Sequence, residues 1–513
     1  MSEIASNSSE ARQVLQTAFS THADNTAFVD LRSGLTLTYR ELEDHSSRTA
    51  ALLARVFGLH AGDEVVLVID NRVEAIILYL ACLQAGITSI PVNPDLKPSE
   101  LAQILSMRRA KLLVTFADLK HRINGAEAPA QFIVGPGDLP GSEPRLSRES
   151  FPHVTDALLA HVVHSSGTTG LPKAIPLRAG KLLRHVRMFS DFHGISSDAT
   201  FYSGLPLAYL GGWYNVTLVP LLSGAKIVLD RAFGPSTMYG FWERARIHGV
   251  THLWVTPSIL SVLLAIGTDD DRDAEYARTG IRWAMVGMAA LQEPLKIQFE
   301  ETFGIPLVQS YGLSESFLFT SGHRSHGTPH GSVGRVLPGY EVRLVTGDGE
   351  LAEQGSSGEI WVRSPYLVEG YVEQPELSQS TFVDGYMRTG DLGRFDEHDN
   401  LFITSRIKEI IIKGGLNLSP HEIEEGIASL EGVSEVCVVG LPHPVLGEQV
   451  CAAIVRSTAG QDLTARAVKE HCRGCMMPLK VPDKIVFVES IPKNSSGKPS
   501  RRDLKSLVDT VLE

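Results

Sequence analysis

The sequence predicts an α/β protein with a large N-terminal domain and a small α+β C-terminal domain. Over the first three hundred residues, short apolar runs typical of buried strands alternate with longer helical patterns. From about residue 334, polar and apolar residues alternate between glycine-rich turns, and the last hundred residues again mix helical and strand patterns. The length of 513 residues is enough for two to four domains.

Buried strands separated by helices predict parallel α/β layers in the N-terminal domain. Residues 65–69 form an uninterrupted apolar run, which is typical of a strand covered on both faces. The longer run at 75–92 contains Gln84 and Gly86, so it predicts a buried helix leading into a strand and no membrane span. Further strands are expected at residues 111–115, 157–163 and 250–255, and a frayed terminus over residues 1–12.

Two alternating segments, 341–345 and 358–362, predict a small antiparallel, β-barrel-like piece at the end of the N-terminal domain. Beyond it we expect helices at 420–430 and 464–472, and strands at 433–439, 450–456 and 485–488. A β-rich run at 410–413 opens this last part. We therefore divide the chain into an N-terminal domain of residues 1–405 and a C-terminal domain of residues 406–513.

Composition limits the kind of partner and the compartment. The net charge of −12 gives no overall basic field, so a nucleic acid is not expected as a partner. Five cysteines in so long a chain imply no disulfide framework, and the polar N-terminus has no signal-peptide core. These features favour a cytoplasmic protein. The pair Cys472 and Cys475 lacks a second ligand pair for zinc, so we expect ordinary thiols.

A glycine- and hydroxyl-rich segment follows the strand predicted at 157–163. Glycines let the backbone approach an anion, hydroxyls and backbone N–H groups surround phosphate oxygens, and a lysine adds positive charge. The segment resembles the phosphate-binding loop of adenylate-forming enzymes. The resemblance implies that ATP or AMP is bound by Ser165, Ser166, Gly167, Thr168, Thr169, Gly170 and Lys173.

Further motifs of that superfamily follow in the expected order. They lie at residues 311–315 (YGLSE, with Ser314 where Thr is usual), 386–391 (YMRTGD), 405–409 (SRIKE), 414–424 (GGLNLSPHEIE) and 492–498 (PKNSSGK). The resemblance spans roughly residues 25–505. The chain resembles acyl- or aryl-CoA synthetases of the AMP-binding superfamily, which also includes peptide-synthetase adenylation domains and luciferases.

The chemistry that this resemblance implies has two steps. A carboxylate attacks the α-phosphate of ATP to give an acyl-AMP and pyrophosphate, and a thiol then takes the acyl group. Charge builds on the α-phosphoryl oxygens, which cations and N–H donors stabilise. By resemblance, Lys498 is the catalytic lysine of adenylation, and Glu315 is a ligand of Mg²⁺, which prefers oxygen ligands.

The resemblance also assigns residues to the nucleotide. Asp391 accepts hydrogen bonds from the ribose, a role that suits a carboxylate. Arg406 adds a ribose or phosphate contact, and Tyr311 packs on the adenine. Residues 287–291 (GMAAL) lie where relatives carry G-G-A-P-L, so Gly287, Met288 and Ala289 are assigned to the wall of the adenine and acyl sites. By the same resemblance, Gly312 and Ser314 of the 311–315 motif also bind the nucleotide.

Lys408 occupies the hinge position of the superfamily. The resemblance implies that the C-terminal domain is mobile and rotates about this residue between the two half-reactions. One orientation delivers Lys498 for adenylation, and the other forms a tunnel for the thiol. Gly414 and Gly415 are expected to line that tunnel, because a thin pantetheine chain needs room beside the backbone.

Residues 205–213 (LPLAYLGGW) resemble the superfamily's P-L-F-H-x-x-G stretch, with Tyr209 in place of His and Ala208 in place of an aromatic residue. Residues 205–217 contain no Asp or Glu to pair an ammonium group, which disfavours amino-acid substrates. An apolar acyl pocket is expected from Tyr209, Gly212, Trp213, Met288 and Gly312. It favours an aromatic or a short- to medium-chain acid, although Trp213 also fits an ordinary helix core.

The leading interpretation is therefore an AMP-forming acid–CoA ligase that uses ATP, Mg²⁺ and CoA, as a monomer or a homodimer. A stand-alone ligase that loads the acid onto the phosphopantetheine arm of a carrier protein is the main alternative, because both acceptors present the same thiol. A non-catalytic nucleotide-binding relative is disfavoured by Lys498, Glu315 and Asp391. A luciferase-like oxidase would use the same adenylate.

Overall fold

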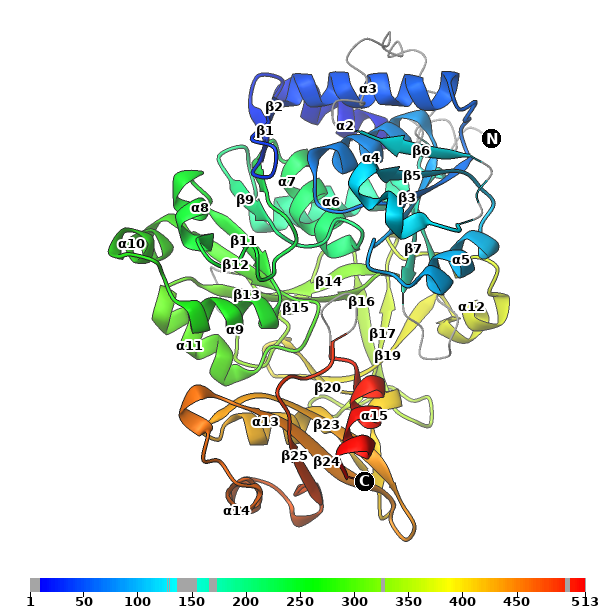
Figure 1. Cartoon of the computed structure of the whole chain (residues 1–513). Coiled ribbons are helices and arrows are strands. Elements are labelled where there is room, and N and C mark those ends of the chain that lie inside the picture. Colours follow the sequence, from blue (N-terminus) through cyan, green and yellow to red (C-terminus); the bar gives the residue numbers. More distant parts are fainter. Residues whose placement is uncertain are drawn as a thin grey trace.

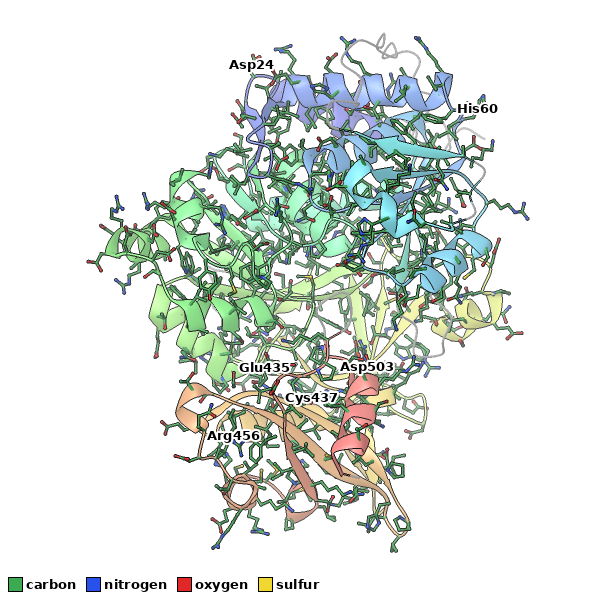
Figure 2. All side chains as sticks on the ribbon, in the orientation of Figure 1. Asp24, His60, Glu435, Cys437, Arg456 and Asp503 are labelled. Atoms are coloured by element: carbon green, nitrogen blue, oxygen red, sulfur yellow. The ribbon has the colours of Figure 1, made fainter. Side chains whose placement is uncertain are left out.

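The computed structural model describes residues 10–126, 128, 130–135, 155–165, 173–323, 328–493 and 499–512. A large part made of the first four hundred residues lies above a smaller C-terminal part (Figure 1). Asp24 and His60 lie at the far end of the large part, and Glu435, Cys437 and Arg456 lie in the smaller C-terminal part (Figure 2).

The largest sheet has nine strands with a parallel centre. The six central strands are parallel, and an antiparallel strand pair at one edge and a single antiparallel strand at the other complete it. In spatial order the strands are β15 (Arg335–Val336), β14 (Phe317–Ser321), β13 (Leu307–Leu313), β12 (Trp283–Val286), β11 (His252–Val255), β9 (Thr200–Ser203), β10 (Lys226–Leu229), β1 (Thr26–Asp30) and β2 (Thr36–Thr38).

A second sheet has six strands, of which only the last is antiparallel to its neighbour. In spatial order they are β6 (Gln131–Val134), β5 (Ala110–Phe116), β3 (Glu64–Val68), β4 (Thr88–Val92), β7 (Leu159–Ser165) and β8 (Lys173–Arg178). The central strands β3 and β4 are almost wholly buried, and for β3 the uninterrupted apolar run at 65–69 predicts this.

Helices cover and separate these sheets (Figure 1). They are α2 (Glu10–Thr21), α3 (Tyr39–Arg55), α4 (Val73–Ala85), α5 (Pro98–Met107), α6 (Ala179–His193), α7 (Val219–Leu222), α8 (Phe241–Ile247), α9 (Pro257–Ile266), α10 (Asp271–Gly280) and α11 (Glu293–Phe303). A 3-10 turn, η1 (Ala117–Ile123), follows β5, and a π-helix, η3 (Gly211–Leu218), precedes α7. Helix α4 is apolar on every side because it is enclosed within the core, and Gly86 ends it in a left-handed conformation.

The predicted antiparallel piece is a separate five-stranded sheet. Its path runs β16 (Glu341–Val345), β17 (Gly358–Arg363), β19 (Tyr386–Phe395) and β18 (Phe382–Val383), and β20 (Leu401–Arg406) also pairs with β19. The short helix α12 (Pro375–Thr381) precedes β18. Residues 341–345 and 358–362 pair antiparallel, as predicted.

The C-terminal part has a five-stranded sheet with a core on each face. Its strands are β22 (Leu416–Leu418), β21 (Ile411–Lys413), β24 (Gly447–Arg456), β23 (Val433–His443) and β25 (Lys484–Phe487). Its helices and turns are η4 (Ile407–Glu409), α13 (Pro420–Ala428), η5 (Thr458–Gly460), α14 (Ala465–Cys475), η6 (Pro478–Lys480) and α15 (Arg501–Leu512). Alternation along β23 sends Val436 and Val438 into one core and Cys437 and Val439 into the other.

Several predicted boundaries need correction. Residues 10–12 were expected in a frayed terminus, but helix α2 begins at Glu10 and buries Ala11. Strand β23 continues to His443 and β24 begins at Gly447, because the two strands form one long hairpin. Cys472 is buried in α14 and Cys475 is exposed at its end. In the described ranges, no helix combines the length and apolar character that crossing a membrane requires.

Candidate functional site

The predicted phosphate loop connects two antiparallel strands. Ser165 at the end of β7 is paired with Lys173 at the start of β8. The two ends of the loop are therefore held together by the hairpin ladder. Ser166, Gly167, Thr168, Thr169 and Gly170 lie outside the described residues.

Lys173 and Glu315, both predicted to act on the phosphates or their metal, lie side by side. The Nζ atom of Lys173 is 3.6 Å from Oε1 of Glu315. A third residue joins them, since the Tyr371 hydroxyl donates to Glu315 Oε1 at 2.8 Å and accepts a hydrogen bond from Lys173 Nζ at 3.1 Å. Glu315 and Tyr371 are buried, whereas Lys173 is partly exposed.

Three segments position this cluster. Glu315 follows strand β13, where Gly312 packs closely against β14: a Cβ at Gly312 would lie 1.9 Å from the Phe317 carbonyl oxygen. The Val368 N–H donates to the Glu315 carbonyl at 3.0 Å, and the Val372 N–H donates to the Ala174 carbonyl at 2.9 Å. The segment that carries Tyr371 is therefore hydrogen-bonded to the backbone of Glu315 and to the backbone of Ala174, which follows Lys173 on β8.

Tyr311, Asp391 and Arg406 form a second cluster. Asp391 on β19 is buried and pairs with Arg406 on β20 in the strand register. Arg406 donates to Asp391 through Nε at 2.6 Å and through Nη2 at 3.3 Å, and the Tyr311 hydroxyl donates to Oδ2 at 2.5 Å. Burial raises the pKa of Tyr311 well above its ordinary value, and the negative charge of Asp391 adds to this, so the hydroxyl remains a donor.

The segment that follows β12 contains a residue in an unusual backbone conformation. Met288 has φ of 68°, a left-handed value that non-glycine residues rarely adopt. Gly287 packs on Ser310, which precedes Tyr311: a Cβ at Gly287 would lie 3.1 Å from Ser310 Oγ. The thioether of Met288 covers Gly211 at the start of the π-helix, where a Cβ would lie 2.7 Å from Met288 Sδ. Ala289 is partly buried beside it.

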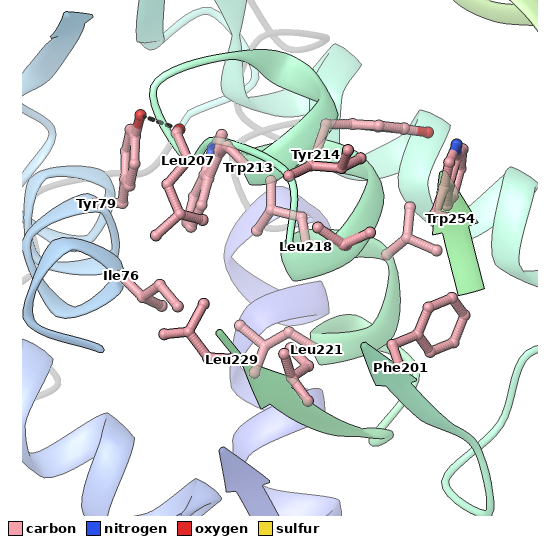
Figure 3. Close-up of a cluster of buried hydrophobic side chains, with 14 of the residues drawn as sticks. Ile76, Tyr79, Phe201, Leu207, Trp213, Tyr214, Leu218, Leu221, Leu229 and Trp254 are labelled. Carbon is pink, nitrogen blue, oxygen red and sulfur yellow. Dashed lines mark hydrogen bonds between the residues drawn. The ribbon is translucent and has the colours of Figure 1, made fainter. Parts of the chain in front are cut away.

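The predicted pocket residue Trp213 belongs to a packed core. Its ring stacks on Tyr79 with centroids 4.2 Å apart (Figure 3). Its Nε1–H donates to His161 Nε2 at 2.8 Å. Burial lowers the pKa of His161 to about 3, so the imidazole is neutral and accepts this hydrogen bond. This packing favours the helix-core interpretation of Trp213. Tyr209 is partly buried ahead of the π-helix, and Gly212 is buried within it.

The residues predicted for domain movement and thiol access lie on the C-terminal part. Lys408 is exposed in the turn η4. Gly414 and Gly415 form the two-residue turn between β21 and β22, and both have positive φ, which suits a glycine pair in a hairpin turn. Both are exposed. Lys498 lies outside the described residues, and Ser314 is partly buried in the turn between β13 and β14.

Two residues that the sequence did not single out hold this region together. Tyr371 joins Lys173 to Glu315, as described above. Asn71 is buried and binds the stretch ahead of Tyr209, donating to the Leu205 carbonyl at 2.9 Å and accepting from the Leu207 N–H at 2.9 Å. Their partners lie 56 to 198 residues away in the chain, so no local pattern marks them.

The chemistry of Glu315 fits a magnesium ligand. Mg²⁺ is held in nucleotide sites by one or two carboxylates together with phosphate oxygens and water. Glu315 Oε1 is occupied by Tyr371 and Lys173, and across the described ranges no residue donates to Oε2. Nor do those ranges contain three or more His, Cys, Asp or Glu side chains arranged around a metal position. A magnesium site in which Glu315 is joined by phosphate oxygens and water needs no such cluster of side chains.

Known proteins are similar to this chain over more than nine-tenths of its length. The profile of the AMP-binding enzyme family matches residues 15–372, and that of the AMP-binding enzyme C-terminal domain matches residues 422–498. An oxalate–CoA ligase of Arabidopsis thaliana is 30% identical over 91% of this chain and 92% of its own length. A sulfoacetate–CoA ligase of Cupriavidus necator is 29% identical over 92% of each chain. The structure of ATP-bound MatB from Rhodopseudomonas palustris superposes with a TM-score of 0.89 at 26% identity, over 98% of this chain and 99% of that one.

Proposed function

The chain belongs to the AMP-binding enzyme family, and we propose that it joins a carboxylic acid to coenzyme A through an acyl-AMP intermediate. The acid, ATP and CoA are the substrates, and Mg²⁺ accompanies ATP. One observation carries the proposal. A cation and a carboxylate, Lys173 and Glu315, lie 3.6 Å apart beside the phosphate loop. Glu315 follows strand β13, and that strand carries Tyr311 of the Tyr311–Asp391–Arg406 cluster.

In the first step, a carboxylate oxygen of the acid attacks the α-phosphorus of ATP. The new O–P bond forms acyl-AMP, and the bond to the oxygen that bridges to the β-phosphorus breaks, so pyrophosphate leaves. Lys173 stabilises the phosphate oxygens, and we assign Lys498 to the α-phosphate. Glu315 is the proposed ligand of Mg²⁺, which when bound neutralises charge on the phosphates.

Asp391 and Arg406 orient the nucleotide in this proposal. The Asp391 carboxylate is held on both oxygens by Tyr311 and Arg406, so its position is fixed before ATP arrives. A fixed acceptor suits the two hydroxyls of a ribose. Arg406 is half-exposed, which leaves part of its guanidinium for a further contact with the ribose or the α-phosphate.

In the second step, the thiol of CoA attacks the acyl carbon. The C–S bond forms, the C–O bond to AMP breaks, and the thiol proton passes to solvent. We propose that residues 406–513 rotate about Lys408 between the steps, withdrawing Lys498 and bringing Gly414 and Gly415 toward the thiol. The exposed position of Lys408 in a short turn between two sheets is compatible with a pivot.

The proposed acid is aromatic or of short to medium chain length. The support is the contact of the Met288 thioether with Gly211 and the absence of acidic residues from 205–217. A carrier protein as the thiol acceptor, a monomeric or homodimeric state and a cytoplasmic location stay predictions.

A panel of acids tests this function. Each acid is incubated with ATP and Mg²⁺, with and without CoA, and acyl-AMP and acyl-CoA are measured by mass spectrometry. Acyl-CoA from one acid class is the expected result. Acyl-AMP that accumulates and does not react with CoA would indicate a carrier protein as acceptor. Neither product from any acid would contradict adenylation.

A further inference from the structure

Tyr371 stands between the two charged residues of the phosphate site. Its hydroxyl accepts from Lys173 Nζ at 3.1 Å and donates to Glu315 Oε1 at 2.8 Å, so one oxygen separates a cation from an anion. The lysine also lies over the tyrosine ring, with Nζ 4.8 Å from its centroid. The two hydrogen bonds need the hydroxyl of Tyr371, and the contact with the lysine needs its ring.

The distances show that Lys173 and Glu315 do not form a close ion pair. Nζ and Oε1 are 3.6 Å apart, whereas a charge-assisted N–H···O bond is about 2.8 Å long. The hydroxyl of Tyr371 makes the shorter contact with each partner. The ammonium group of Lys173 is therefore not in close contact with the Glu315 carboxylate, and the lysine side chain is partly exposed to solvent.

Tyr371 is also held by contacts that do not involve the side chains of these two residues. Its backbone N–H donates to Ser378 Oγ at 2.9 Å, and Ser378 Oγ donates to the Gln374 carbonyl at 2.8 Å. Its ring lies 5.9 Å from the ring of Phe382. The hydroxyl is thus placed by α12 and β18, so it supplies a fixed point against which Glu315 is oriented.

We propose that Tyr371 is a positioning residue that holds Glu315 and Lys173 apart and orients both toward Mg²⁺·ATP. The inference rests on the proposed function. By occupying Oε1, Tyr371 leaves Oε2 of Glu315 as the oxygen that would bind Mg²⁺. By accepting from Lys173, it keeps the ammonium from closing onto the carboxylate, so the lysine remains available to a phosphate.

Removing the hydroxyl tests this role. In Tyr371→Phe the ring remains, but Lys173 is free to approach Glu315 and neutralise it. We expect affinity for Mg²⁺·ATP to fall about tenfold, the size of effect seen when groups that orient a metal ligand are removed. Affinity for adenosine should stay unchanged, because adenosine carries no phosphate. Calorimetric binding without acid measures both, and Tyr276→Phe, whose hydroxyl binds the distant Val250 carbonyl, is the matched control.

A second pair of variants, built on Lys173→Gln, separates a positioning role of Tyr371 from a general loss of structure. In Lys173→Gln there is no ammonium to collapse onto Glu315, so adding Tyr371→Phe should weaken Mg²⁺·ATP binding by less than about threefold. Equal losses of adenosine and Mg²⁺·ATP in Tyr371→Phe, or unchanged Mg²⁺·ATP binding, would overturn the inference while leaving the proposed function intact. A wild-type protein that binds neither ligand would overturn the function and the inference together.

Discussion

Arg406, the last residue of β20, holds the buried carboxylate of Asp391 through two hydrogen bonds and directly precedes the turn that carries Lys408. Asp391 is 3% exposed, so it depends on this partner and on Tyr311 for compensation of its charge. The proposed ribose site is therefore connected through one residue to the proposed hinge.

Arg406→Ala should weaken nucleotide binding. The carboxylate of Asp391 would lose its charged partner and its fixed orientation, which we expect to raise the dissociation constant of adenosine about tenfold, equivalent to about 1.4 kcal/mol. Calorimetric titration measures this. Arg394→Ala is the control, because Arg394 lies on β19, the strand that carries Asp391, and packs on Phe402. An equal loss in both variants would contradict the specific role of Arg406.

Lys498→Ala should separate the two half-reactions. We expect adenylation to slow by at least about a hundredfold, the scale of losing a group that stabilises developing charge. Thioester formation from supplied acyl-AMP should change less than about threefold. Rapid-quench assays of each step give the comparison, with Lys493→Ala as a control from the same segment, where the lysine pairs with Glu435. The assignment fails if both steps slow alike.

Lys408→Pro should block the second step alone. Proline fixes φ near −65° and removes a backbone N–H, so it restricts rotation at the proposed pivot. Adenylation should be retained, while thioesterification falls at least about tenfold. Lys408→Ala removes the charge but leaves the backbone free, and it should retain both steps. Full turnover by the proline variant would rule out rotation at this residue.

Met288→Gly should widen the choice of acid. The substitution removes the thioether that covers Gly211 and suits the positive φ of this position. We expect the ratio of kcat/KM for a bulkier acid over a shorter one to rise about tenfold. Gly211→Ala, whose added Cβ meets Met288 Sδ, should shift selectivity the opposite way or reduce activity with every acid. Unchanged selectivity in Met288→Gly would place the acid elsewhere.

Buried histidines should make the protein less stable in acid. Burial lowers the pKa of His161 and of His185 to about 3, from an ordinary value of 6.5. The unfolded chain therefore binds more protons below pH 6.5, and stability falls as pH drops from 6.5 toward 3. Each group contributes about 1.4 kcal/mol per pH unit in that range. Urea unfolding of His161→Gln should show a shallower pH dependence than wild type, and an identical dependence would contradict this.

Local patterns predicted most of the fold. The strands predicted at 65–69 and 111–115 are observed as β3 (Glu64–Val68) and β5 (Ala110–Phe116). Their apolar side chains are covered on both faces, and apolar runs in the sequence indicate that burial. Helix α2 was missed over residues 10–12, since its single buried stripe begins among polar residues. The sequence analysis assigned Gly414 and Gly415 only to the thiol tunnel and did not predict the hairpin turn that they form.

The site was predicted less completely. Motifs predicted Glu315 and Asp391 as site residues, but the contacts that orient them come from residues far away in the chain. Tyr371 reaches Lys173 across 198 positions, and no spacing rule encodes such a contact. Trp213 shows a further limit: an apolar aromatic residue in a helix fits a pocket wall and a core equally well, and only its stacking on Tyr79 favours the core.

Oxygen labelling tests the central chemistry most directly. The acid identified in the panel is prepared with ¹⁸O in its carboxylate and converted with ATP, Mg²⁺ and CoA, and the AMP is examined by mass spectrometry. If a carboxylate oxygen attacks the α-phosphorus, one ¹⁸O is transferred to AMP when the thiol displaces it. Unlabelled AMP, or label in inorganic phosphate with ADP as the product, would contradict formation of an acyl-AMP.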